Sequence, residues 1–194
     1  EGCSPTGFRV FYEGERCAAT GVREARDTWW AQVVDALGGE LLANGSFSGS
    51  MVEGAGFPAG DSAERVAALA RDGQAPDAVL VFMGINDYGW GGATAQAAGR
   101  GNAVPVALDL DAIEPHAPAA AAPGAIDRFR AAYGLLLERM RAAYPQAEVW
   151  CCTLCPGRVV GRDGSTFAYR LRGVPFDAYN DAIRAAARAH GCRV

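Results

Sequence analysis

The sequence contains no lysine, so all 18 of its basic residues are arginine. Without lysine there is no Gly-Lys pair for a Walker A phosphate-binding loop. The net charge of −4 and the isoelectric point near 5.2 leave no excess of basic residues for general nucleic-acid binding. No apolar run is long enough to span a bilayer, and no signal-peptide pattern is visible. We therefore expect neither a nucleic-acid partner nor a membrane span.

Cysteine and histidine are too few, and too poorly placed, for a metal centre or a disulfide scaffold. Cys151 and Cys152 lie in an apolar run with Cys155 at its end, and no histidine is near them. This is typical of buried structural thiols and favours a reducing compartment, with a leaning towards the cytoplasm. The two histidines, His116 and His190, do not follow a carboxylate by three residues. We interpret them as packing or surface residues and predict no metal ligands.

Two further motifs are incomplete. The α/β-hydrolase elbow needs serine in the middle of Gly-x-Ser-x-Gly, but Gly45–Gly49 has Phe47 there. The glycines of 54–60 superficially resemble a dinucleotide fingerprint, but Pro58 interrupts them and they do not join a strand directly to a helix. We predict a plain loop there and no cofactor.

What the sequence does contain is an alternation of apolar patterns in a chain of which half is hydrophobic. Residues at helical spacing predict four helices, and short apolar runs predict strands between them. The helices are expected from Asp27 or Thr28 to Leu37, from Asp61 to Gly73, from Ile126 to Tyr144, and from Phe176 to His190. The strands are expected at 40–43, 78–83, 148–154 and from Cys192 onward. Surface loops are expected at 1–26 and at 156–175, and an insertion without clean periodicity at 93–124.

This order of elements predicts the fold class. Strands that alternate with helices form parallel sheets with helices on both faces. We therefore expect an α/β protein, a three-layer α/β/α sandwich, in one domain over residues 1–194.

The loop after the second expected strand is the first candidate site. Val79–Met83 reads as a strand buried on both faces, and it is followed at once by Gly84, Asn86 and Asp87. In an open parallel sheet, ligands bind where the chain leaves the carboxyl ends of the strands.

A small-residue loop at 44–50 leaves the preceding strand at the same edge. The backbone N–H of Gly49 and the side-chain N–H of Asn86 could converge there as an oxyanion hole, which stabilises negative charge on an acyl oxygen. Residue types alone favour a structural role over this one, in which Gly49 and Gly84 allow tight turns and Asn86 caps a loop.

Both loops resemble sequence blocks of the SGNH (GDSL-type) superfamily of serine esterases and lipases. Asn44–Gly49 is similar to its second block, Gly84–Asp87 matches its third block, Gly-x-Asn-Asp, and the similarity extends from Thr28 onward. The resemblance implies a flavodoxin-like fold with sheet order 2-1-3-4-5. It also implies an oxyanion hole from Gly49 and Asn86.

The resemblance gives supporting roles to neighbouring residues. Gly84 would let the chain turn sharply, and Asp87 would hold Asn86 by local hydrogen bonding. Trp90 and the insertion at 93–124 would form a lid or a wall of the acyl site, with a passive surface excursion as the alternative.

Two blocks of the superfamily are not found in this sequence. They are the Gly-Asp-Ser block of the nucleophile, at the end of the family's first strand, and the Asp-x-x-His block of the base, after its last strand. The sequence begins at Glu1 and ends at Val194, within the strand that is expected from Cys192 onward. We expect it to be a fragment that lacks both blocks and the central first strand.

The resulting functional prediction is a hydrolase of carboxylic esters. Small acyl groups such as acetyl are favoured, with acetylated carbohydrates among the candidate substrates. Two alternatives stay open: a non-catalytic flavodoxin-like domain that binds a small ligand or a carbohydrate, and an acyltransferase of the same superfamily. The sequence does not indicate an oligomeric state.

Overall fold

The computed structural model of the chain describes residues 24–47, 50–54, 56–90, 124–154, 158–160, 166–168 and 176–194. The chain divides into two compact units, which are Glu1–Ser48 with Ala68–Pro76, and Gly49–Ala67 with Asp77–Val194. Gly49 and residues 93–123 of the expected insertion lie outside the described residues. The expectation of one domain stays a prediction.

The first unit contains the predicted N-terminal helix. A 3-10 turn, η2 (Ala25–Asp27), leads to Thr28, the N-cap of α2 (Trp29–Ala36). The chain leaves the helix through Gly38, whose φ of +64° suits glycine. This helix therefore begins and ends where the sequence predicts.

The prediction of a strand at 40–43 is wrong, because these residues form no strand. Leu41 is 46% exposed, although a core strand would bury it. Apolar residues favour a strand, but it forms only where a neighbouring strand pairs with its backbone.

The second unit is built on a parallel pair of strands, β1 (Ala78–Val81) and β2 (Glu148–Cys151). Val79 pairs with Val149 and Val81 with Cys151, so their side chains share one face. Beyond β2 the chain end adds a parallel bridge at Arg193, whose N–H donates to the Val149 carbonyl at 2.8 Å. The two expected strands at 78 and 148 are thus adjacent and parallel, whereas the strand expected from Cys192 onward is present only as this single parallel bridge.

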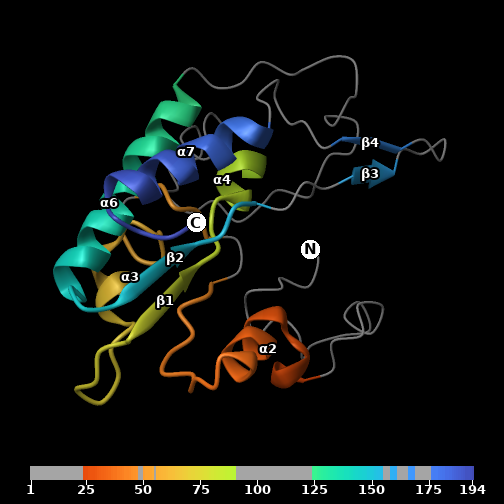
Figure 1. Cartoon of the computed structure of the whole chain (residues 1–194). Coiled ribbons are helices and arrows are strands. Elements are labelled where there is room, and N and C mark those ends of the chain that lie inside the picture. Colours follow the sequence, from red (N-terminus) through yellow and green to blue (C-terminus); the bar gives the residue numbers. More distant parts are fainter. Residues whose placement is uncertain are drawn as a thin grey trace. The chain divides into compact units, whose positions relative to one another are not determined.

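Two long helices, α6 (Ala125–Ala143) and α7 (Phe176–Ala189), pack against each other, and α7 contacts β2 (Figure 1). Both confirm predicted helices, and Tyr144-Pro145 ends the first of them. The buried face of the sheet and the inward residues of the two helices form the core. Its most deeply buried side chains include Phe129, Tyr133, Leu136, Leu137 and Ile183.

The opposite face of the strand pair is more open. Leu80 is half-buried, and Trp150 beside it is 38% exposed, with the Arg193 guanidinium 4.8 Å from its ring centre. The prediction that Val79–Met83 is buried on both faces is therefore wrong, because burial alternates along β1. A parallel sheet with helices is an α/β arrangement, and its third layer stays a prediction.

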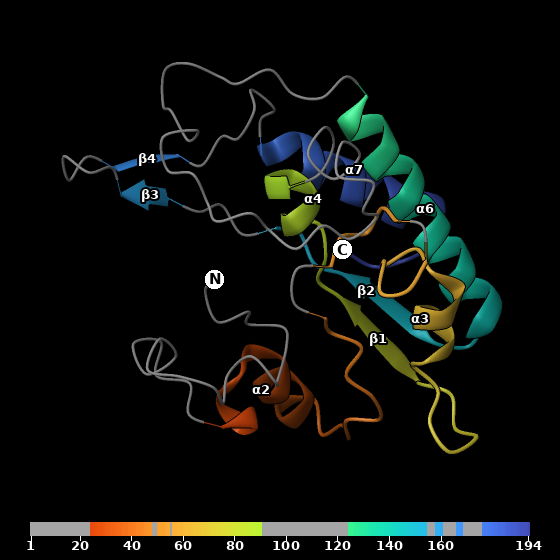
Figure 2. The same ribbon diagram turned by 180° about the vertical axis from the view of Figure 1, so that it is seen from behind.

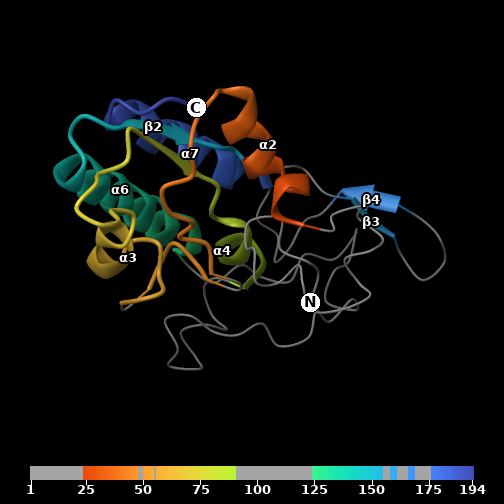
Figure 3. The same cartoon turned by 90° about the horizontal axis from the view of Figure 1, so that it is seen from below.

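Two short helices complete the region around the strands. The helix expected from Asp61 to Gly73 is only α3 (Ala63–Ala67), which contacts α6 (Figures 2 and 3). The Ser62 hydroxyl accepts the N–H of Arg65 at the start of α3. The loop expected after β1 is the helix α4 (Ile85–Trp90).

The region expected as an irregular loop at 156–175 also contains regular structure. β3 (Arg158–Val160) and β4 (Thr166–Ala168) pair as antiparallel strands.

Among the described residues, no helix combines the length and apolar character that crossing a bilayer requires.

Candidate functional site

The candidate site begins where the chain leaves β1. Gly84 has a φ of +124°, a conformation that residues with side chains rarely adopt. A Cβ added here would lie 3.0 Å from Cζ of Phe129 in α6 and 3.5 Å from Leu154. The Gly84 carbonyl then accepts the N–H of Tyr88, the first turn of α4. The turn therefore allows the chain to enter α4 directly above the core.

Asn86, in the first turn of α4, contacts the segment Ser50–Gly54 that follows the small-residue loop. Its side-chain Nδ2 donates to the Ser50 carbonyl at 2.9 Å. Ser50 is the neighbour of Gly49 in the chain, so the structure brings the Asn86 amide to the residue beside the other predicted donor. Gly49 itself lies outside the described residues.

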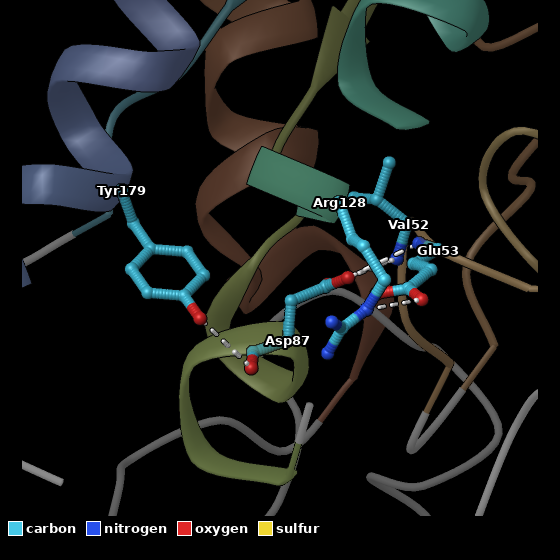
Figure 4. Close-up of polar contacts among 5 residues, drawn as sticks. All are labelled: Val52, Glu53, Asp87, Arg128 and Tyr179. Carbon is cyan, nitrogen blue, oxygen red and sulfur yellow. Dashed lines mark hydrogen bonds and ion pairs between the residues drawn. The ribbon is translucent and has the colours of Figure 1, made fainter. Parts of the chain in front are cut away.

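Asp87 fixes the same segment, as Figure 4 shows. Its carboxylate accepts the backbone N–H of Val52 at 2.8 Å to Oδ2 and 3.0 Å to Oδ1, and that of Glu53 at 3.1 Å. Asp87 was expected to hold Asn86 instead. The reason is geometric: in a helix, adjacent side chains point in different directions, so Asn86 reaches Ser50 whereas Asp87 reaches Val52 and Glu53 of the same segment.

The Asp87 carboxyl group is buried, with 3% of its surface exposed. Burial raises the pKa of Asp87 to about 7, because the charged form loses its hydration, while the Val52 and Glu53 amides favour the charged form. The negative charge of Glu53 raises the pKa further. Ionised Asp87 is therefore costly to bury, and its amide contacts offset part of that cost.

Two arginines surround this segment. Arg65 of α3 donates to the Ser50 hydroxyl at 2.9 Å and to the Pro58 carbonyl. Arg128 of α6 donates from Nε to Oε1 of Glu53 at 3.1 Å (Figure 4). No motif in the sequence predicted a role for either arginine. One signal is present in the sequence: Arg65 and the apolar Leu69 are four residues apart, so they share one face of the helix expected over 61–73, and a buried arginine needs partners.

Helix α7 supports the site from the core side. The Tyr179 hydroxyl donates to the Asp87 carbonyl at 3.4 Å (Figure 4), and its ring packs on those of Phe129 and Tyr88 at 4.7 and 5.3 Å. The Asn180 side chain binds both backbone groups of Leu154, at 2.7 and 3.1 Å. The exits of β1 and β2 are thus held by the same helix.

The other residues considered in the sequence, Trp90, the insertion and the cysteines, do not take part in these contacts or lie outside the described residues. Trp90 ends α4, but its side chain, like the expected insertion, is outside the described residues. Cys151 is buried, and burial raises the pKa of its thiol to about 12, which makes it unreactive. The described residues include no cluster of metal-ligating side chains.

Comparison with known families identifies the chain. The model of the GDSL-like Lipase/Acylhydrolase family matches residues 12–194, nearly the whole sequence. The chain belongs to the GDSL-like lipase/acylhydrolase family. The superfamily resemblance found in the sequence is thereby confirmed, and the family supports a hydrolase.

A solved structure of a candidate GDSL-like lipase from Bacteroides uniformis is also similar to this GDSL-family chain. The sequence identity is 23% and the TM-score 0.48; the match covers 89% of this chain. The chain spans 64% of the length of that structure. The search of curated proteins gave no match. For this GDSL-family member, the substrate and the roles of individual residues are proposals.

Proposed function

We propose that this GDSL-family protein hydrolyses carboxylic esters, with Asn86 and Gly49 as donors of its oxyanion hole. The observation that carries the proposal is the hydrogen bond from Asn86 Nδ2 to the Ser50 carbonyl. It orients the carboxamide towards the residue that follows Gly49. A primary amide carries two N–H groups, so one can bind Ser50 while the other is directed at a substrate.

The chemistry proposed is that of a serine esterase. A serine oxygen attacks the ester carbonyl, and a histidine accepts the serine proton and passes it to the leaving alcohol. Water then cleaves the acyl-enzyme and releases the acid. The serine and histidine are those of the family blocks not found in this sequence. The negative charge that develops on the carbonyl oxygen is where the N–H groups of Gly49 and Asn86 act.

Residues around these donors have supporting roles in the proposal. Asp87 holds Val52 and Glu53 by their amides, and Gly84 allows the turn that carries Asn86. Trp90 and the insertion at 93–124 are proposed to contribute to the wall of the acyl site. A small acyl group such as acetyl is the proposed preference, with acetylated carbohydrates among the candidate substrates.

The first prediction concerns Asn86→Ala, made in the protein encoded by the complete reading frame. Loss of one oxyanion donor should lower kcat for p-nitrophenyl acetate by about 10²–10³-fold with a smaller effect on KM. Gln32→Ala is a matched control, since it also removes a carboxamide that donates to a backbone carbonyl, at 3.1 Å from Asp27. The control should keep its kcat. Unchanged turnover in Asn86→Ala would remove Asn86 from the mechanism.

The reaction class is tested on the same protein. A fluorophosphonate probe should label the wild type covalently, and product analysis with an added alcohol should show the free acid as main product. An ester of the added alcohol as the main product would make the protein an acyltransferase. A silent probe together with intact binding of a small ligand would contradict catalysis altogether.

A further inference from the structure

Arg65 is the most deeply buried arginine beside the candidate site, with 8% of its surface exposed. It lies in the short helix α3, and its guanidinium NH1 group donates to two acceptors of one chain segment. These are the hydroxyl oxygen of Ser50, at 2.9 Å, and the carbonyl oxygen of Pro58. One side chain therefore joins the two ends of the stretch between Ser50 and Pro58.

Burying this charge is costly. Burial lowers the pKa of Arg65 to about 10, and the negative charge of Asp87 opposes that change. The guanidinium thus stays charged at neutral pH. A well-packed apolar side chain of similar volume often stabilises a protein as much as a buried charge does, or more. Stability alone therefore does not explain an arginine here, and its directed hydrogen bonds need another reason.

Ser50 connects Arg65 to the proposed oxyanion hole. Its hydroxyl accepts the Arg65 guanidinium, and its carbonyl accepts the Asn86 carboxamide at 2.9 Å. Two residues further, Val52 donates its N–H to Asp87. Asn86 and Asp87 hold the segment from α4, whereas Arg65 holds it from α3. Without Arg65, the Ser50 hydroxyl would lose this hydrogen bond from α3.

We propose that Arg65 is a positioning residue of the oxyanion site, which acts through Ser50 to set the direction of the Asn86 amide. This inference rests on the proposed ester hydrolysis. Arg65 itself does not contact the reacting atoms. Its contribution is to keep the Ser50 carbonyl, and with it the Asn86 N–H groups, in one orientation while charge develops on the substrate. Such preorganisation acts on kcat, because it costs no rearrangement during the reaction.

The test compares Arg65→Met and Arg65→Lys with a matched control. Arg141→Met is the control, because Arg141 also donates to a backbone carbonyl, that of Ala147 at 3.0 Å, before the start of β2. With p-nitrophenyl acetate, Arg65→Met should lower kcat about 10-fold to 100-fold and change KM by less than about threefold. Arg65→Lys should recover part of kcat, because an ammonium group can still donate. Arg141→Met should keep the wild-type kcat.

A double-mutant cycle with Ser50→Ala tests the route. Ser50→Ala removes the hydroxyl acceptor but keeps the carbonyl that binds Asn86. If Arg65 acts through Ser50, the double variant should be no slower than Arg65→Met alone, since the two changes remove the same contact. Fully additive losses in kcat would overturn the proposal. So would a normal kcat in Arg65→Met. If Arg65→Met does not fold, the cycle is carried out with Arg65→Lys.

A readout that needs no activity separates this inference from the proposed function. The side-chain amide resonance of Asn86, assigned by its loss in Asn86→Asp, should shift in ¹⁵N–¹H spectra of Arg65→Lys and exchange faster with solvent. It should stay unchanged in Arg141→Met. A wild type without esterase activity would overturn ester hydrolysis, but these spectra would still test Arg65. An unchanged Asn86 resonance in Arg65→Lys would overturn the positioning role even in an active enzyme.

Discussion

The core between α6, α7 and the strands differs in kind from the polar rim, which is the group of Ser50, Arg65, Asn86 and Asp87 at the exit of β1, although both contain buried side chains. In the core, Phe129, Tyr133 and Ile183 are 1% exposed or less. At the rim, Asp87 is 3% exposed and Arg65 is 8% exposed. Burial of apolar surface stabilises the fold by about 25 cal/mol per Å², whereas burial of a charge costs free energy even when it is paired.

The difference indicates a division of labour within the second unit. The apolar core supplies the stability that keeps the strand ends and α4 in place. The polar rim uses part of that stability to hold backbone and amide groups in fixed directions, as preorganised binding sites do. The two regions meet at Gly84, whose added Cβ would lie 3.0 Å from Phe129.

The largest expected effect is in the core. Phe129→Ala should lower the free energy of unfolding by about 3–5 kcal/mol, because it removes the ring that packs on Tyr179 at 4.7 Å and leaves a cavity. Urea unfolding measured by circular dichroism checks the value. A loss below about 1 kcal/mol would mean that this packing does not stabilise the fold. It would contradict the view that the apolar core supplies the stability of the second unit.

The second-largest effect is expected at Gly84, where the apolar core and the polar rim meet. Gly84→Ala should cost about 2–4 kcal/mol, since alanine is strained at a φ of +124° and its Cβ would press on Phe129. Adding Phe129→Leu should relieve the contact but not the backbone strain. The same urea measurements should therefore show partial recovery in the double variant. Full recovery would mean that the φ value imposes no penalty.

The buried carboxyl group of Asp87 should make the free energy of unfolding depend on pH. The pKa of Asp87 is raised to about 7 by burial, so the folded protein binds a proton that the unfolded chain has lost. This contribution is complete below the ordinary aspartate pKa and is lost as the pH rises through 7. Between pH 6 and pH 8 the free energy of unfolding should fall by about 1.4 kcal/mol on this account.

Asp87→Asn is the variant that isolates this contribution. It should be less stable overall, because an amide cannot accept all the N–H bonds of the carboxylate, but its pH dependence should be flatter by the stated amount. Urea unfolding at pH 6, 7 and 8 gives both slopes. Parallel slopes for wild type and variant would show that Asp87 does not change its charge there.

The smallest effect is expected on the surface of α6. Arg130 and Asp127 form an ion pair of 2.8 Å, three residues apart, with side chains 54% and 73% exposed. Arg130→Ala should change the free energy of unfolding by less than about 0.5 kcal/mol, since solvent screens such pairs. Thermal unfolding at low and high salt checks this. A larger, salt-dependent loss would show that exposed charges also stabilise this helix.

Patterns with a clear period were predicted well. The stripe of Phe129, Tyr133 and Leu137 gives α6 within one residue of its observed start and end, and the apolar run at 78–83 gives β1, which ends two residues earlier than expected, at Val81. Both follow from local chemistry, since a helix satisfies its own hydrogen bonds and an apolar run between turns has few alternatives. The strand expected at 40–43 was wrong because its existence depends on a partner.

The sequence predicted where the candidate site lies but not which residues form hydrogen bonds with one another there. Asn86 was placed at the exit of β1, where it lies. That Asp87 binds Val52, and that Arg65 binds Ser50, involves pairs separated by 35 and 15 residues in the sequence. No local pattern specifies which distant backbone group a carboxylate or guanidinium meets.

By itself, the sequence determined the family, the helices α2, α6 and α7, the parallel strands β1 and β2, and the position of Asn86 directly after β1. These depend on periodicity, turn residues and short motifs, which act over a few residues. The tertiary structure decided what lies against α4, the helix that carries Asn86: a segment held by Asp87 from one side and by Arg65 from another. The physical reason is that burial forces each polar group to find a partner, and which partner is within reach depends on how the whole chain packs.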